Sequence, residues 1–319
     1  MPNFFFNICP CCNDDHFFYL DKVDNGMVKV EKPKETYVVQ CNNCGMFYCN
    51  PLPEWNESDF YELYSSEYFP QEQFSDIIDA KCRSKREKAR IYNAQRRYSY
   101  VKKYLNDSIK DNNYKILEFG AGIQPWFSLL LAKKGYKVSI QEPSKSFALV
   151  LKQKYNFNII EESFTSISAE HNSTYRLIFS DSVMEHVHNP VDYMKKCADL
   201  LEPGGVYFFT TPAINSFKDI VYNCIRKMIG TNKKYANISP YVEPYHVIGF
   251  SKKSLQIMAE KAGLKLVRSV RCHDGEYWKI WEDKKFNIFV IPLVIFCSFI
   301  LWFADKLGLG TNRELIFQK

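Results

Sequence analysis

The middle of the chain alternates short apolar runs with longer amphipathic segments. We expect five strands there, at Lys115–Phe119, Lys137–Gln141, Phe157–Ile160, Tyr175–Ser180 and Val206–Thr210. Three helices are expected between them, at Pro125–Lys134, Lys145–Tyr155 and Pro190–Leu201. Ser144 and Asn189 are good N-cap residues, and Gly135 suits a C-cap. This alternation predicts βαβ units and a parallel, doubly wound α/β sheet.

The pattern changes after residue 211. Residues 212–250 show no clear period and are rich in Tyr, Asn and Lys, so we expect an irregular cap. Ser251 then caps an expected helix at Lys252–Ala262. Strands at Leu264–Arg271 and Glu314–Phe317 complete the expected sheet.

The chain begins differently, with a cysteine-rich head. Six cysteines and few helical patterns fall within residues 1–55, and residues 56–113 are expected to form a helical linker. The expected α/β domain then spans residues 114–319, with the cap at 212–250 and an apolar helical segment at 286–303.

Composition narrows the class of protein. The 319 residues are 46% hydrophobic and 24% charged, which is typical of a folded globular protein. A mean hydropathy of −0.31 excludes a multi-span membrane protein. The first ten residues, MPNFFFNICP, lack a basic n-region and a cleavage site, so we expect a cytoplasmic protein with reduced thiols or metal ligands.

The net charge of +6 is concentrated in one segment. Lys81–Arg97 contains eight basic residues and one acid, so the rest of the chain is close to neutral. The segment is expected to be a helix, and two interpretations stay open. It is a solvated helix face, or it binds the phosphate of a nucleotide-sugar, a lipid-linked phosphate, an anionic membrane or RNA. RNA is less favoured, because RNA-binding surfaces usually spread basic residues among base-stacking aromatics.

The apolar segment 286–303 has only Asn287, Pro292 and Ser298 as non-apolar positions. Eighteen helical residues span about 27 Å, slightly less than the hydrocarbon core of a bilayer. We therefore expect a membrane-surface or re-entrant helical pair, with a buried helix as the alternative. The first option predicts a peripheral protein at the inner face of the plasma membrane.

A glycine-containing loop follows the first predicted strand. Gly120 and Gly122 allow a sharp turn and a close approach to a ligand. Glu142, 22 residues after Gly120, ends the second strand, where an acid can accept hydrogen bonds from ribose hydroxyls. A dinucleotide site needs a third glycine where Pro125 stands. Glu118 would repel a pyrophosphate but suits a cationic ligand with an amino-acid end.

Four motifs in order, ILEFGAG, IQEP, YRLIFSDSVMEHVHNP and LLEPGGVYFFTTP, resemble the class I S-adenosylmethionine-dependent methyltransferases over roughly residues 85–270. The resemblance implies a Rossmann-like, seven-stranded sheet and S-adenosylmethionine as cofactor. It implies that Gly120 and Gly122 line the methionine part, that Glu118 supports their loop and that Glu142 binds the ribose diol.

The same resemblance places further residues around the cofactor. Ser163 and Phe164 stand where the family has an acid and a neighbour that contact adenine, so Ser163 departs from the pattern. Gln124 replaces a small residue of the glycine loop. Ser180 and Asp181 end the fourth strand, beside the expected position of the methyl group.

The Met184-Glu185-His186 segment follows that strand and supplies the candidate catalytic residues. Methyl transfer to a hydroxyl requires removal of its proton, which a histidine can accept near neutral pH. His186 is the first candidate base, assisted by Glu185, and His246 is the second. The alternative is that the Glu-His pair caps the next turn and packs beside the cofactor.

The pair is also similar to a metal motif. Small-RNA 3′-end 2′-O-methyltransferases and ubiquinone-pathway O-methyltransferases carry Glu-x-x-Glu-His and a later His, which can hold a divalent ion. Ser182 stands where the first Glu would be, so a catalytic divalent metal is not expected here.

The cysteine-rich head contains two C-x2-C pairs. Cys9, Cys12, Cys41 and Cys44 match the ligand set of a closed, structural Zn²⁺ site, with Cys11 and Cys49 as possible substitutes. The segment ending in CNNCGMFYCNPLP resembles zinc ribbons fused to bacterial sugar methyltransferases.

Together these features predict O-methylation of a sugar hydroxyl in a surface glycan or in its nucleotide- or lipid-linked precursor. The alternatives are an RNA methyltransferase, and a non-catalytic module that keeps the fold but has lost cofactor binding.

Overall fold

The structure is a computed structural model. It describes residues 8–23, 36–51, 85–105, 114–122, 125–168, 171–228, 230, 238, 246–273, 299–300 and 302–319. Gln124, most of the expected linker at 56–113 and most of the apolar segment 286–303 lie outside the described residues.

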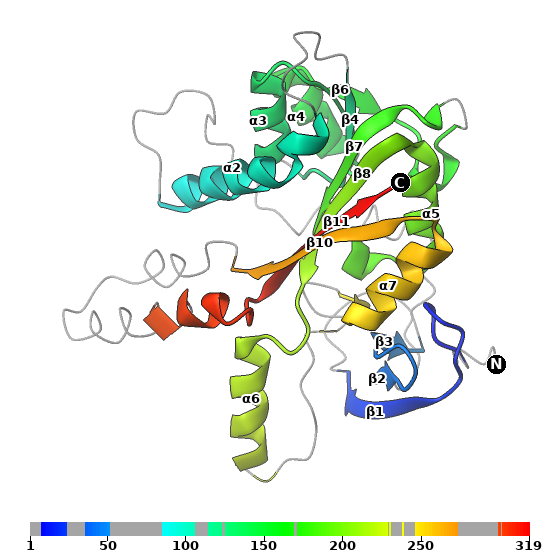
Figure 1. Cartoon of the computed structure of the whole chain (residues 1–319), viewed down its shortest axis with the longest axis vertical. Coiled ribbons are helices and arrows are strands. Elements are labelled where there is room, and N and C mark those ends of the chain that lie inside the picture. Colours follow the sequence, from blue (N-terminus) through cyan, green and yellow to red (C-terminus); the bar gives the residue numbers. More distant parts are fainter. Residues whose placement is uncertain are drawn as a thin grey trace.

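A seven-stranded sheet forms the centre of the molecule (Figure 1). Its strand order is β10-β11-β8-β7-β4-β5-β6. The strands are β4 (Lys115–Phe119), β5 (Lys137–Gln141), β6 (Asn158–Ile160), β7 (Tyr175–Asp181), β8 (Leu201–Pro212), β10 (Lys265–Cys272) and β11 (Asn312–Gln318). The strands from β6 to β8 pair in parallel, and β11 is antiparallel to both of its neighbours. The predicted doubly wound α/β fold is confirmed.

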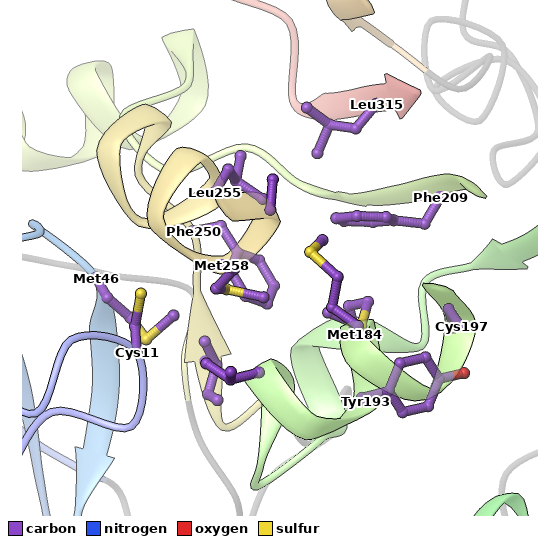
Figure 2. Packing of buried hydrophobic residues seen from close by; sticks show 14 of the residues in the cluster. Cys11, Met46, Met184, Tyr193, Cys197, Phe209, Phe250, Leu255, Met258 and Leu315 are labelled. Atoms are coloured by element: carbon purple, nitrogen blue, oxygen red, sulfur yellow. The ribbon is translucent and has the colours of Figure 1, made fainter. Parts of the chain in front are cut away.

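Helices cover both faces of this sheet. On one face, α2 (Lys85–Leu105), α3 (Trp126–Lys133) and α4 (Lys145–Tyr155) bury Val101, Phe127 and Leu151 against Ile140 and Phe208. On the other face, α5 (Pro190–Leu200) and α7 (Lys252–Lys261) pack on Phe209 and Leu315. Figure 2 shows this second core, in which Met184 lies beside Phe209. Two apolar layers therefore enclose the central strands.

The predicted element bounds agree closely with the structure for β4, β5 and α4. The N-cap of α4 is also confirmed, because the Ser144 hydroxyl accepts a hydrogen bond from the Phe147 amide. Asn189 makes no side-chain cap at α5, since its amide donates to Asp192 instead. Strand β8 is longer than predicted, because Leu201 already pairs with Tyr175.

The expectation of an irregular segment after residue 211 is wrong for one stretch. Residues Phe217–Met228 form helix α6, which extends away from the sheet in Figure 1. Asp219 explains its start, since its carboxylate accepts a hydrogen bond from the Ser216 amide and so caps the first turn.

A second, four-stranded sheet contains the cysteine-rich head. It comprises β1 (Phe17–Lys22), β2 (Tyr37–Cys41), β3 (Phe47–Asn50) and β9 (Ile248–Gly249), in that order. The fourth strand, β9, is distant in sequence from the other three and pairs antiparallel with β3. The head is therefore joined to the α/β body by a shared sheet.

The described part of the basic run lies in α2, as predicted. Among the described residues, no helix combines the length and apolarity needed to cross a membrane.

Candidate active site

The glycine loop leaves β4 and lies beside the ends of β5 and β7. Gly120 and Gly122 have φ values of +62° and +59°, which side chains rarely tolerate. A Cβ atom at Gly120 would lie 2.8 Å from Val183 Cγ2, whereas one at Gly122 would meet no described atom within 4 Å. The first glycine is required by close packing, and the second faces open space that a ligand can occupy.

Glu118 lies beneath this loop. It is only 3% exposed and accepts a hydrogen bond from the Ser128 hydroxyl of α3. Burial raises the pKa of Glu118 to about 8, although the bond from Ser128 acts in the opposite direction. A buried carboxyl group of this kind is stabilised in its charged form by a nearby cation, which fits a positively charged ligand.

Glu142 holds the loop to the end of β5. One carboxylate oxygen accepts a bond from the Gly122 amide at 2.8 Å, and the other accepts from the Ser144 amide at 3.0 Å. Burial still raises the pKa of Glu142 to about 7. Each oxygen keeps a second acceptor position, so the residue is able to bind a ribose diol while it fixes the loop.

The predicted adenine-contacting residues lie after β6. The Ser163 hydroxyl accepts a bond from the Ser166 amide and so caps a short 3-10 helix, Phe164–Ser166. The Phe164 ring stacks on Tyr193, with centroids 3.8 Å apart and planes at 8°. The Phe164 ring also packs edge-on against Phe119, directly before the glycine loop, with centroids 5.1 Å apart. Contact of Ser163 and Phe164 with adenine stays a prediction.

The end of β7 is fixed by polar contacts. Ser180 is fully buried, and its hydroxyl lies 2.8 Å from the Tyr207 hydroxyl. The Asp181 carboxylate accepts bonds from Arg97 of α2 and from the Thr210 hydroxyl. Both side chains thus support the end of the strand, and their part in cofactor binding stays a prediction.

Arg97 is a residue that the sequence pattern did not single out. It is 6% exposed and also donates to Glu314 of β11 at 3.0 Å, where Arg96 donates at 2.7 Å. Although burial alone would raise the pKa of Asp181, Arg97 and Thr210 hold it below its usual value. Two of the arginines in the basic run therefore neutralise internal carboxylates instead of presenting their charge to a partner.

Glu185, His186 and His246 come together, although 60 residues separate the two histidines in sequence. The His186 and His246 rings have centroids 5.2 Å apart, and His246 Nε2 lies 3.9 Å from Glu185 Oε1. Glu185 is 1% exposed, and neither of its oxygens accepts a hydrogen bond within the described structure. Burial raises its pKa to about 8.

The same three residues have a ligand set that a divalent ion could use. One ligand atom from each lies within 4.8 Å of the others. The set contains a single carboxylate, because Ser182 takes the place of the other acid of the similar motif. Ser182 adopts a φ of +56°, an uncommon backbone conformation that often marks functional sites.

The head brings together the four predicted zinc ligands. One Sγ from each of Cys9, Cys12, Cys41 and Cys44 lies within 4.8 Å of the others. The Cys44 amide points at Cys41 Sγ at 3.5 Å, and Gly45 has a φ of +70°, so the Cys41–Gly45 segment turns tightly around the sulfurs. The hydrogen bond between Cys9 and Cys44 and their burial raise the pKa of Cys9.

Neither substitute cysteine joins this cluster. Cys11 donates to the Ser254 carbonyl oxygen, and Cys49 lies fully buried in β3. Three of the four close thiols are buried and that of Cys12 is partly buried. Such a group ionises only when a cation compensates its charge, so the cluster fits tetrahedral Zn²⁺.

The head and the candidate base residues are connected through Val247. Its amide donates to the Glu185 carbonyl oxygen at 2.8 Å, and its own carbonyl accepts from the Cys49 amide at 3.0 Å. The start of α7 adds a further link, since the Ser251 hydroxyl donates to the Cys44 carbonyl oxygen. The position of His246 thus depends on the cysteine-rich head.

A family model described as a methyltransferase domain matches residues 87–269. The chain belongs to this family. It is an S-adenosylmethionine-dependent methyltransferase, and the strand order of its sheet and its glycine loop agree with that assignment. The non-catalytic alternative is therefore set aside.

Comparison with curated proteins finds O-methyltransferases. The methyltransferase is 28% identical over 176 residues to the ubiquinone biosynthesis O-methyltransferase of Coxiella burnetii, covering 54% of this chain and 72% of that protein. The protein of the same name from Shewanella pealeana is 35% identical over 54 residues, or 17% and 23% of the two chains.

Solved methyltransferases are more distant. One from Archaeoglobus fulgidus is 12% identical, with a TM-score of 0.46 over 72% of this chain and 94% of that one. Magnesium protoporphyrin IX methyltransferase from Synechocystis PCC 6803 is 10% identical, with a TM-score of 0.46 over 76% and 90%.

Proposed function

We propose that this methyltransferase methylates a sugar hydroxyl of a surface glycan or of its nucleotide- or lipid-linked precursor. The observation that carries the proposal is the cluster of Glu185, His186 and His246, whose histidines can accept a proton. Glu185 and His186 follow Val183, whose side chain packs against Gly120 of the glycine loop. The resemblance of the cysteine-rich head to ribbons of sugar methyltransferases favours a sugar over other hydroxyl compounds.

The residues present suggest how the proton is handled. When bound, S-adenosylmethionine supplies a methyl group on a positively charged sulfur and leaves as a neutral thioether. The acceptor oxygen forms the new C–O bond and loses its proton, which His186 or His246 accepts. Glu185 lies buried beside His246, and the positive charge of an imidazolium there would lower the pKa of Glu185 and so favour an ion pair between the two.

Two variants test this assignment. We expect His186→Gln or His246→Gln to lower kcat by about 10²-fold or more, because a positioned base contributes that much. The dissociation constant of S-adenosylmethionine, measured by calorimetry, should stay unchanged, while Glu142→Ala should weaken it. His171→Gln, which alters a histidine that pairs with Tyr175, serves as the control. Full kcat in both variants would exclude a histidine base.

A phenolic hydroxyl is the second candidate acceptor. It is favoured by the similarity to proteins named ubiquinone biosynthesis O-methyltransferases. The acceptors are distinguished by incubating the protein and S-adenosylmethionine separately with a nucleoside-diphosphate hexose, a catechol or a short RNA. The amount of demethylated cofactor formed is measured in each case. Transfer to the catechol alone would overturn the sugar proposal. The RNA alternative loses support, because Arg96 and Arg97 already bind internal carboxylates.

We also propose that Cys9, Cys12, Cys41 and Cys44 hold a structural Zn²⁺ ion. Four thiolate ligands leave no coordination position for a substrate, so the ion would stabilise the head and would take no part in methyl transfer. One zinc per chain, measured by atomic absorption, is the expected content.

Peripheral membrane contact is a further part of the proposal. Helix α6 exposes an apolar stripe of Ile220, Val221, Ile225 and Met228, and Trp302 is also exposed. These side chains support contact with a lipid surface. Cosedimentation with anionic vesicles is expected, and recovery of all protein in the supernatant would contradict it.

A further inference from the structure

Three polar residues form a row across the sheet on the side of the candidate base cluster. Arg313 of β11 lies directly opposite Thr211 of β8 and opposite Arg271 of β10. Directly opposed residues of antiparallel strands point to the same face. On the same face, the neighbouring pair of this row is Phe209 and Leu315, which lie near Met184 in Figure 2. Glu185 comes next in the chain after Met184.

The side chain of Arg313 is a buried cation that has no partner among the residues that the structure describes. It is 8% exposed, its Nε is buried, and it makes no hydrogen bond or ion pair with any residue that the structure describes. Burial and the charge of Arg271 lower its pKa to about 10, so it stays protonated at neutral pH. Buried charges in proteins are normally paired, and an unpaired guanidinium therefore needs a separate explanation.

The neighbours of Arg313 do not supply the missing negative charge. Arg271 donates to the carbonyl oxygens of Ile214 at 2.8 Å and Asn215 at 3.3 Å, so it braces the turn before α6. The charge of Asp219 acts on Arg271, and its carboxylate accepts from the Ser216 amide. The half-buried Arg271 thus has one carboxylate near it, and the buried Arg313 adds a second positive charge, which leaves a net positive charge in the row.

We propose that Arg313, supported by Arg271, binds an anionic group of the acceptor, either a phosphate or a carboxylate. The inference rests on the proposed function and specifies its substrate class. A guanidinium presents parallel N–H donors that match both oxyanions. The row shares a face with the base cluster, and Thr211 lies close enough to Glu185 to lower the pKa of that carboxyl group. One acceptor could therefore contact both.

The direct test is anion binding. Calorimetry measures binding of inorganic pyrophosphate and of glucuronate, with glucose as the neutral reference. Wild type is expected to bind one of the two anions, and which one tells a phosphate acceptor from a carboxylate acceptor. Arg313→Gln should weaken that binding by about tenfold or more. Arg268→Gln should not, since Arg268 is exposed and lies opposite Ile316 on the other face.

Thermal unfolding provides an independent readout. Because an unpaired buried charge is destabilising, Arg313→Met should raise the unfolding midpoint by about 2 °C or more without ligand. The bound anion should stabilise wild type but not this variant. A purely structural arginine would show the opposite sign, since its loss would lower the midpoint.

Each result decides a separate question. Failure of wild type to bind either anion, or equal binding by Arg313→Gln, overturns the anion site. If Arg313-dependent binding persists while no hydroxyl acceptor is methylated, the anion site stands and the proposed function fails. Unchanged binding of S-adenosylmethionine in the variants shows that the cofactor site is intact.

Discussion

Replacing Arg97 with methionine tests whether buried charge holds α2 to the sheet. The guanidinium donates to Asp181 at 2.6 Å and to Glu314 at 3.0 Å, across two different strands. Methionine retains much of the apolar contact of the side chain but leaves both carboxylates without this cation. The perturbation therefore removes charge with little change in packing.

The structure sets the expected magnitude. Removing one member of a buried ion pair costs about 3–5 kcal/mol. Two features place Arg97→Met at the lower end of that range. The Asp181 side chain is 38% exposed, and Glu314 retains Arg96 at 2.7 Å. We expect a loss of about 3 kcal/mol in the free energy of unfolding.

A matched control is available in Arg268→Met. The Arg268 guanidinium lies 3.7 Å from the ring centroid of Tyr100 and so also joins α2 to the sheet. It is exposed, and such a contact is worth about 0.5–1 kcal/mol. Urea unfolding of both variants, followed by far-UV circular dichroism, compares the two values at similar slopes.

Equal losses in the two variants would refute the reasoning. A second check uses pH, because the pKa of Asp181 lies below its usual value in the folded protein. The stabilisation by Arg97 should therefore be present above the unfolded-state pKa and be lost as pH falls through the folded-state value. An Arg97→Met loss that stays constant into strong acid would contradict an ionic origin.

Three further predictions concern the loop and the head. Gly120→Ala should weaken binding of S-adenosylmethionine by about tenfold or more, because its Cβ would overlap a neighbouring side chain, whereas Gly263→Ala, at a similar φ but with open space around it, should not. Cys44→Ser should abolish zinc content and lower the melting temperature, while Cys224→Ser, an exposed cysteine, should change neither. Glu118→Gln should flatten the pH dependence of stability. The pKa of Glu118 in the folded protein, about 8, exceeds the ordinary value of 4.5, so the wild type should lose stability as pH rises between these values. Urea unfolding at about pH 5 and about pH 8 measures this loss.

Much of the fold could be predicted because its elements carry local signals. Strand β4 is rich in apolar residues, and β5 alternates polar residues with Val138 and Ile140. Ser144 and Gly135 mark helix ends by their own conformational preferences. Helix α6 was missed although its apolar residues follow a helical period. Its polar, Asn- and Lys-rich surroundings concealed a stripe that faces solvent instead of the core.

The site was harder to predict where contacts are long-range. The basic run Lys81–Arg97 contains eight similar residues, and nothing local shows that Arg97 meets carboxylates 84 and 217 positions away. The pairing of β9 with β3 of the head is also long-range, and β9 has only two residues. Motifs therefore located Glu185 and His186, whereas the packing of His246 beside them required the folded chain.

The backbone hydrogen bonds of Val247 affect how the protein unfolds locally. Its peptide group is bonded on one side to the segment that carries Glu185 and on the other to the strand that carries Cys49. Neither the Glu185 segment nor the Cys49 strand can separate from Val247 without leaving backbone polar groups unpaired. Amide hydrogen exchange at Val247 and Cys49 should therefore proceed through one common opening reaction, so the cysteine-rich head and the base cluster would form a single cooperative unit.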